Sequence, residues 1–193
     1  MAAGGWPYLL AMRSPNLFLA AGMTLLGLAH PAAAQTRPAH PAAHPPARAA
    51  NAPKSIGKFD DWQAATHQEA GQQVCYAFTR ANASMPALPG RGDVVLTVTQ
   101  RSPGRDAVAI SAGFAYPPGA EVQVSVETTQ STFYTANRSA FARDGKAVVA
   151  AFEKGRQAVA RSPGPRNTPV SDTFSLRGFS PAYAAINKAC PAR

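Results

Sequence analysis

Three stretches of the chain alternate between apolar residues and polar or small ones. They are DVVLTVT at 93–99, DAVAISAGF at 106–114 and EVQVSVE at 121–127. Alternation with a period of two places the apolar residues on one face of an extended strand, and it is typical of antiparallel sheets with one buried face. The residues predicted to face inward are Val94, Leu96, Val98, Val108, Ile110, Ala112, Phe114, Val122, Val124 and Val126.

Five further stretches have the composition of strands. They are FDDWQAAT at 59–66, QQVCYAFT at 72–79, TFYTA at 132–136, RQAVAR at 156–161 and VSDTFSLR at 170–177. Together with the first three, they predict a mainly β fold. We expect either an antiparallel β-sandwich or an open barrel of about seven or eight strands.

Two helices are expected beside these strands. Asp144 can cap a short internal helix that ends at Gly155. Near the C-terminus, Ser180 is the predicted N-cap of a second helix, with Pro181 at the first helical position. The residues expected on the buried faces of the two helices are Val148 or Val149, Phe152, Ala182, Tyr183, Ile186 and Cys190.

The tetrapeptide RSPG occurs at 101–104 and again at 161–164, each time after a strand candidate. Proline fixes φ and glycine accepts a positive φ, so the sequence predicts two type II turns. Arginines flank both turns, and they would form a basic edge if the turns meet. Another arginine occupies a later turn that does not require its charge. The candidate binding surface for an anion therefore comprises Arg101, Arg105, Arg161, Arg166 and Arg177.

The N-terminal part of the chain is predicted to direct export. Arg13 precedes the apolar run 17–29, and the small residues at 32–34 follow it, which is the order of a signal peptide cleaved after Ala34. The run is short for a membrane span, so we expect no transmembrane segment in the mature chain. Met12 is the hypothetical translation start, because residues 1–11 are uncharged and unlike a signal-peptide start.

Residues 35–53 are rich in proline and alanine and contain almost no large apolar side chain. Such a segment cannot bury enough surface to offset the entropy cost of ordering, so the sequence predicts a disordered tether there. The predicted organisation is therefore a signal peptide at 1–34, a tether at 35–53 and one folded domain at 54–193.

Only two cysteines are present, Cys75 and Cys190. In an exported chain such a pair is interpreted as a disulfide, and these two cysteines have only one way to pair. Closing a loop of this length stabilises a protein by about 4 to 5 kcal/mol in the chain-entropy model. The expected location is the periplasm or the extracellular medium.

The predicted domain is basic. It holds all ten acidic residues and sixteen of the nineteen basic ones, which leaves a net charge of +6. A basic surface attracts anionic partners. Neither an arginine-rich helix nor a basic strand face interleaved with stacking aromatics is found, so no nucleic-acid partner is predicted.

Several patterns would carry chemistry in another context. His67 is the one histidine of the predicted domain, and Asp60 and Asp61 are adjacent, so on a strand they would face opposite sides. His40 and His44 lie in the tether and could bind a metal only weakly. The sequence therefore predicts no catalytic, cofactor-binding or metal-binding residue, and no cofactor.

The tripeptide at 91–93, Arg-Gly-Asp, has the composition of an integrin-recognition motif. Its plainer interpretation is a turn at Gly90 and Gly92, followed by a strand that begins at Asp93. A match of three residues carries little information. We expect the turn.

A set of residues spread over 59–191 resembles the invasion-associated locus B family of exported alphaproteobacterial envelope proteins. The resemblance rests on Trp62, Cys75-Tyr76, Arg91-Gly92-Asp93-Val94, Lys154-Gly155 and, above all, the closing segment DTFSLRGF at 172–179 with Cys190. Two departures are Phe141, where the family tends to have tryptophan, and the loop RSPGPRNTP at 161–169. The resemblance implies a virulence-associated cell-envelope protein, with no catalytic residues to carry over.

The leading prediction is a disulfide-linked, non-enzymatic envelope protein of this type. It would act by binding an anionic or protein partner of the envelope or of a host-cell surface. The alternative is a small periplasmic hydrolase or a weak metal-binding protein. A pocket lined by His67 or by converging carboxylates would favour the alternative.

Overall fold

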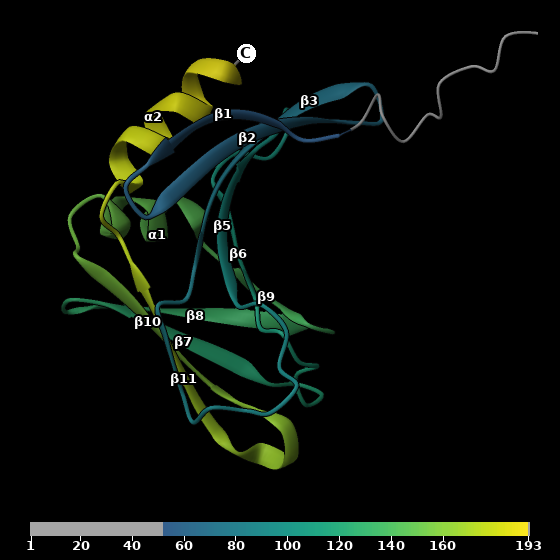
Figure 1. The fold of residues 1–193 in the computed structure, drawn as a ribbon, viewed down its shortest axis with the longest axis vertical. Coiled ribbons are helices and arrows are strands. Elements are labelled where there is room, and N and C mark those ends of the chain that lie inside the picture. The colour runs from purple at the N-terminus through teal and green to yellow at the C-terminus, as the bar shows by residue number, and fades with distance from the viewer. Residues whose placement is uncertain (1–51, 193) are drawn as a thin grey trace, which may run out of the picture. The chain divides into compact units, whose positions relative to one another are not determined.

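The computed structural model describes residues 52–192. The predicted signal peptide, most of the predicted tether, Met12, His40 and His44 lie outside the described residues. Within these residues, eleven antiparallel strands form one sheet in the order β1-β2-β3-β5-β6-β9-β8-β7-β10-β11-β4 (Figure 1). The strands are β1 (Lys54–Phe59), β2 (Trp62–Glu69), β3 (Gln72–Arg80), β4 (Ala83–Met85), β5 (Val95–Gln100), β6 (Ala107–Ser111), β7 (Glu121–Val126), β8 (Thr129–Ala136), β9 (Ser139–Ala142), β10 (Gln157–Pro163) and β11 (Pro169–Ser175).

The prediction of a mainly antiparallel β fold is confirmed. The sheet is continuous and has two open edges, β1 and β4, so it corresponds to the open alternative and not to two separate sheets. All eight strand candidates form strands, but the predicted number is too low by three. The additional strands are β1, β4 and β9, and these are short or interrupted by glycine, so they show no clear alternation.

The stretch 59–66, expected to be one strand, contains the last residue of β1, a turn and the first part of β2. Asp60 and Asp61 form the turn between β1 and β2, and Asp60 has a positive φ of 47°. Phe59 pairs with Trp62 across this turn. The expectation that the two carboxylates face opposite sides of a strand is therefore wrong, because both belong to a turn.

The core lies between the two halves of the sheet and under its helices. The residues predicted to face inward from 93–99, 106–114 and 121–127 are all buried. The sheet bends between β6 and β9, and side chains from both halves join one hydrophobic cluster (Figure 1). Its largest fully buried members are Trp62, Phe133, Phe152, Phe174 and Phe179.

Two α-helices complete the domain, α1 (Gly145–Phe152) and α2 (Phe179–Ala189). The Asp144 side chain accepts a hydrogen bond from the Ala147 amide at 3.0 Å, so the predicted cap of α1 is confirmed. The predicted cap of α2 at Ser180 is wrong, since the N-cap is Gly178 with a φ of 87°. A side chain at Gly178 would come within 2.0 Å of the Phe59 carbonyl oxygen, so glycine is required there.

The second RSPG tetrapeptide, at 161–164, does not form the predicted turn. Arg161, Ser162 and Pro163 pair with β11 as the end of β10, and Gly164 has an extended φ of −94°. The chain reverses only in the following short 3₁₀ helix, η1 (Pro165–Asn167). In the first RSPG tetrapeptide, at 101–104, Gly104 has the expected positive φ. Pairing with β11 therefore determines the conformation of the second RSPG tetrapeptide.

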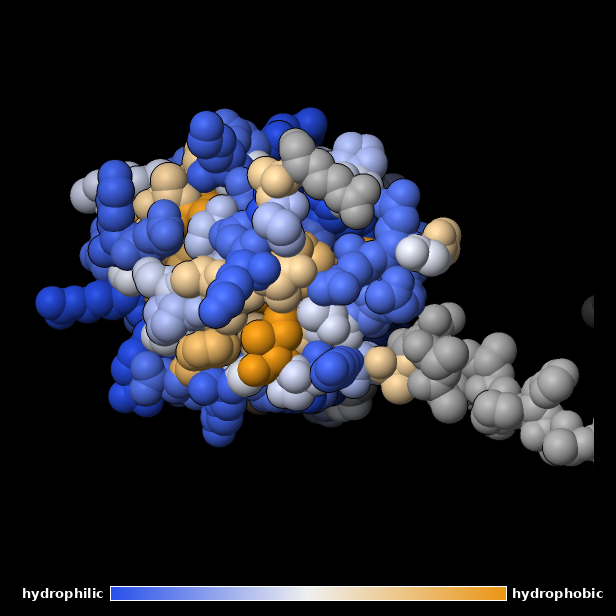
Figure 2. Space-filling view, turned by 90° about the horizontal axis from the view of Figure 1, so that it is seen from above, coloured by the Kyte–Doolittle hydropathy of each residue, from blue (hydrophilic) through white to orange (hydrophobic). Residues whose placement is uncertain are grey.

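Seen from above, the surface is mostly hydrophilic (Figure 2). Small hydrophobic areas lie between the hydrophilic residues on this face. No helix among residues 52–192 is long and apolar enough to cross a membrane.

Candidate functional site

The C-terminal segment from Asp172 to Cys190 is fastened to the sheet along its whole length. At its end, a disulfide joins Cys190 to Cys75 of β3, with the two Cα atoms 5.9 Å apart. Beside it, the Gln73 side chain donates a hydrogen bond to the Ala189 carbonyl at 3.0 Å. The predicted pairing of the two cysteines is thus present in the structure.

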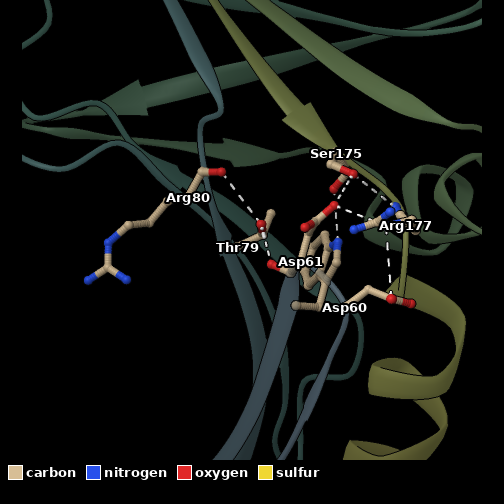
Figure 3. A network of polar contacts seen from close by, with 7 residues as sticks. Asp60, Asp61, Thr79, Arg80, Ser175 and Arg177 are labelled. Carbon is tan, nitrogen blue, oxygen red and sulfur yellow. Dashed lines mark hydrogen bonds and ion pairs between the residues drawn. The ribbon is translucent and has the colours of Figure 1, made fainter.

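Arg177 lies in the turn between β11 and α2, where it faces the turn between β1 and β2 (Figure 3). Its Nε atom is 3.5 Å from Asp61 Oδ2 and 3.9 Å from Asp60 Oδ1. The Ser175 hydroxyl donates to Asp61 at 2.7 Å, and the Thr79 hydroxyl donates to the Asp61 carbonyl at 2.7 Å. Arg177 therefore has carboxylate partners within the chain.

A second ion pair lies at the other end of this segment and is buried. Arg91 donates two hydrogen bonds to the Asp172 carboxylate, at 2.8 and 2.7 Å, and the two side chains are only 7% and 4% exposed. The Ser84 hydroxyl also donates to Asp172, at 2.7 Å. The Arg91 guanidinium lies 4.8 Å from the centre of the Phe114 ring. This pair joins the chain before β5 to β11.

The burial of Arg91 also determines how the tripeptide at 91–93 must be interpreted. Arg91 points into the domain, whereas Asp93 is exposed and pairs with Arg80 at 3.2 Å. An adhesive motif needs both charges on the surface. The geometry agrees with the structural interpretation of this tripeptide.

Tyr116 lies near the buried pair. Burial, together with the negative charge of Asp172, raises the pKa of Tyr116 to about 12. The phenol is therefore neutral at physiological pH. The buried region around Asp172 holds one compensated charge pair and a neutral phenol.

The first two candidate arginines lie near the C-terminal end of α2. Arg101 donates to Glu69 at 2.8 Å, and this contact lowers the pKa of Glu69. Arg105 donates to the Cys190 carbonyl at 2.7 Å and to Asn187. Both arginines are thus bonded to groups of the same chain.

Arg161 and Arg166 lie elsewhere, on β10 and in η1. The loop between β10 and β11 lies at the foot of Figure 1, and the C-terminal end of α2 lies at the top. The two RSPG tetrapeptides therefore do not meet. The five candidate arginines form three separate groups: Arg101 with Arg105, Arg161 with Arg166, and Arg177 alone. Neither Arg161 nor Arg166 forms an ion pair with any of residues 52–192.

A groove of about 550 Å³ surrounds Arg161 on the outer face of four neighbouring strands. Register places Gln123, Arg161, Ser171 and Met85 side by side, one on each of β7, β10, β11 and β4. Met85 is 68% exposed, more than any other large apolar side chain among residues 52–192. We call this the Arg161 groove. Its other lining residues are Glu121, Ser162, Pro163, Asn167, Pro169 and Val170.

The candidates for catalysis and metal binding are dispersed. His67 packs edge to face on Tyr76, with ring centres 5.5 Å apart, and it lines two hollows, neither of which contains a carboxylate. The hollow beside Asp60 and Asp61 does not include His67. The hydrolase or metal-binding alternative therefore stays open. Within residues 52–192, no three His, Cys, Asp or Glu side chains are grouped as metal ligands. The predictions of no catalytic residue and no metal site stay predictions.

The residues that sequence reasoning missed are Met85, Arg91 and Asp172. Arg91 and Asp172 are 81 residues apart in the chain. Only the sheet order brings them together, so no local pattern could have paired them. Met85 belongs to the three-residue β4, which is too short to show a period.

The fold and these contacts define a class of protein: an open antiparallel sheet whose C-terminal segment, from Asp172 to Cys190, is held by a disulfide and by two ion-pair networks. Residues 62–187 match the model of the invasion associated locus B (IalB) protein family. Since this match covers more than half of the chain, the protein belongs to that family. No curated protein matches the sequence.

One similar solved structure is the crystal structure of invasion associated protein B from Bartonella henselae. The TM-score is 0.52 at 18% sequence identity, over 69% of this chain and 95% of that one. At this identity the likeness concerns the fold. The family resemblance identified from the sequence is confirmed.

Proposed function

We propose that the protein is exported to the cell envelope and acts there by binding an anionic partner in the Arg161 groove. The partner would be a protein segment with a carboxylate next to an apolar side chain. Host-cell contact is one setting for such binding, because the family is named for invasion. Binding alone, without catalysis, is the proposed activity.

The observation that carries this function is that Arg161 lines a groove and has no ion-pair partner among residues 52–192. Arg166 also has no such partner, but it does not line the groove. Arg101, Arg105 and Arg177 are bonded to a carboxylate or a carbonyl of the chain. Arg161 forms no ion pair with a described residue, and in the groove it lies between Gln123 and Ser171, with exposed Met85 on the next strand beyond Ser171. Glu121, at the groove, is paired with Arg143 at 3.1 Å. A carboxylate next to Arg161 would form a charge-assisted hydrogen bond.

Photo-crosslinking in the native organism would test this function. A photoreactive amino acid at position 85 of the full chain should crosslink one envelope protein, and Arg161→Glu should abolish that product. Arg101→Glu is the matched control, because it makes the same charge change at a distant turn. Crosslinking that survives Arg161→Glu, or no product at all, would contradict binding in this groove.

Export has a separate test. The mature protein should occur in the periplasmic or extracellular fraction, with an N-terminus that begins at Gln35, and with Cys75 and Cys190 unreactive toward thiol reagents until reduced. Recovery of the uncleaved precursor in the cytoplasm would contradict an envelope function.

A further inference from the structure

A second groove lies on the outer face of β2, β3 and β5, away from the candidate arginines on β10 and η1. Its volume is about 340 Å³, within the usual range for small-molecule sites. Its lining residues are His67, Tyr76, Phe78, Val95, Thr97, Thr99 and Arg101. The groove shares none of its lining residues with the Arg161 groove.

Strand register gives this groove two parallel rows. Tyr76 and Phe78 alternate along β3, and their ring centres are 5.9 Å apart with a tilt of 30°. Across the ladder, Tyr76 pairs with Thr99 and Phe78 pairs with Thr97. A row of aromatic rings therefore runs beside a row of hydroxyls, and all four side chains are partly exposed. Directly paired residues in a sheet point to the same side.

The polar groups of this groove are available to a ligand. The hydroxyls of Tyr76, Thr97 and Thr99 make no hydrogen bond to residues 52–192. Each hydroxyl can both donate and accept. The groove thus offers three hydroxyl groups beside two apolar ring surfaces.

The charges around this groove are already paired. Arg101 is bonded to Glu69, and Arg80, which follows Phe78 on β3, is bonded to Asp93. A charged ligand would have to displace one of these partners, whereas an uncharged ligand would not. Charge complementarity therefore favours a neutral occupant.

A pyranose sugar fits these requirements. It presents C–H groups on its ring faces, which the negative face of an aromatic ring attracts, and hydroxyls at its edge, which both donate and accept hydrogen bonds. We propose that the groove formed by Tyr76, Phe78, Thr97 and Thr99 binds a neutral, β-linked pyranose chain. A groove that runs along two strands suits a linear chain. This site acts independently of the Arg161 groove.

Titration of the mature domain with chitopentaose and with cellopentaose, followed by amide NMR shifts, would test this site. We expect saturable shifts confined to β3 and β5, from at least one sugar. A response to both would indicate a general β-linked pyranose site, and a response to chitopentaose alone would indicate N-acetylated sugars. Absence of any saturable shift at millimolar sugar would overturn the assignment.

Substitutions then assign the binding to particular groups. Thr97→Val with Thr99→Val keeps the shape and removes two hydroxyls, so affinity should fall at least tenfold. Phe78→Leu keeps an apolar side chain but removes the ring, with a similar expected loss. Tyr134→Ser, an exposed aromatic on β8, is the matched control and should bind as the wild type.

The rival ligand is a proline-rich peptide, since aromatic grooves also bind polyproline helices. Saturable shifts of β3 and β5 with decaproline, and none with either sugar, would overturn sugar binding. Arg161→Glu should leave the sugar affinity unchanged. Failure of sugar binding would therefore leave the proposed function standing, and the reverse also holds.

Discussion

Asp172 and Arg177 lie in the same C-terminal segment and both form ion pairs, but the two surroundings differ. The Arg91–Asp172 pair is bidentate, almost fully buried and supported by Ser84. The contacts of Arg177 with Asp60 and Asp61 are longer, and the Arg177 side chain is 71% exposed. A buried charge that loses its partner has no water to replace it, whereas an exposed one does. Removing the arginine should therefore lower the free energy of unfolding much more in the buried pair than in the exposed one.

Removing the arginine of the buried pair should have the largest effect. Arg91→Ala leaves the Asp172 carboxylate buried without its partner, and we expect the free energy of unfolding to fall by about 3 to 5 kcal/mol. Urea unfolding followed by circular dichroism would measure it. The double variant Arg91→Met with Asp172→Leu should lose less than the two single changes summed. Simple additivity would contradict a direct coupling.

The disulfide fastens the same segment without any charge, so its removal shows how much of the attachment is covalent. Replacing both Cys75 and Cys190 with serine should lower the free energy of unfolding by about 2 to 4 kcal/mol, because the unfolded chain gains freedom. This is below the chain-entropy value, since an unfolded chain retains some structure even without the disulfide. The wild type in reducing buffer is the matched control. If the two samples unfold at different urea concentrations, the serine side chains contribute an effect of their own.

Alkaline pH gives a test of the buried region around Asp172. The ordinary pKa of tyrosine is 10.0, and that of Tyr116 is raised to about 12 by burial and by Asp172. The stability contributed by the neutral phenol is therefore complete below pH 10 and is lost as the pH rises toward 12. The expected loss is about 1 to 2 kcal/mol, below the full value of the shift because the phenol is partly exposed.

Urea midpoints between pH 9 and pH 12 would measure this loss, with Tyr116→Phe as the variant. Part of the decrease should remain in that variant, since burial also raises the pKa of Tyr76 and Tyr183. An identical pH profile for Tyr116→Phe and the wild type would show that the phenol does not titrate in this way.

Truncating the exposed arginine should have the smallest effect. Arg177→Ala breaks contacts that solvent and salt screen, so we expect a loss of less than about 1 kcal/mol. The effect should shrink further in 1 M NaCl, where charges are screened within a few ångströms. A loss as large as that of Arg91→Ala would remove the distinction between the two pairs.

The sequence by itself predicted the fold class, the eight strands with clear patterns, both helices, the disulfide pairing and the family. These features rest on local periodicity, on capping and turn residues, and on the presence of only two cysteines, which can pair in only one way. The strand and helix patterns involve residues only two to four positions apart, so they can be recognised in the sequence without knowledge of the fold.

Only the tertiary structure decided how the charges are used. From the sequence, Arg91 belongs to a turn and Arg177 has no evident partner. In the structure, the sheet order places Asp172 next to Arg91 and the β1–β2 turn next to Arg177. The fold also separates the two RSPG tetrapeptides and places Arg161 and Met85 in one groove, on either side of Ser171. Ion pairs between residues far apart in the chain depend on strand order and register, and no local pattern in the sequence encodes them.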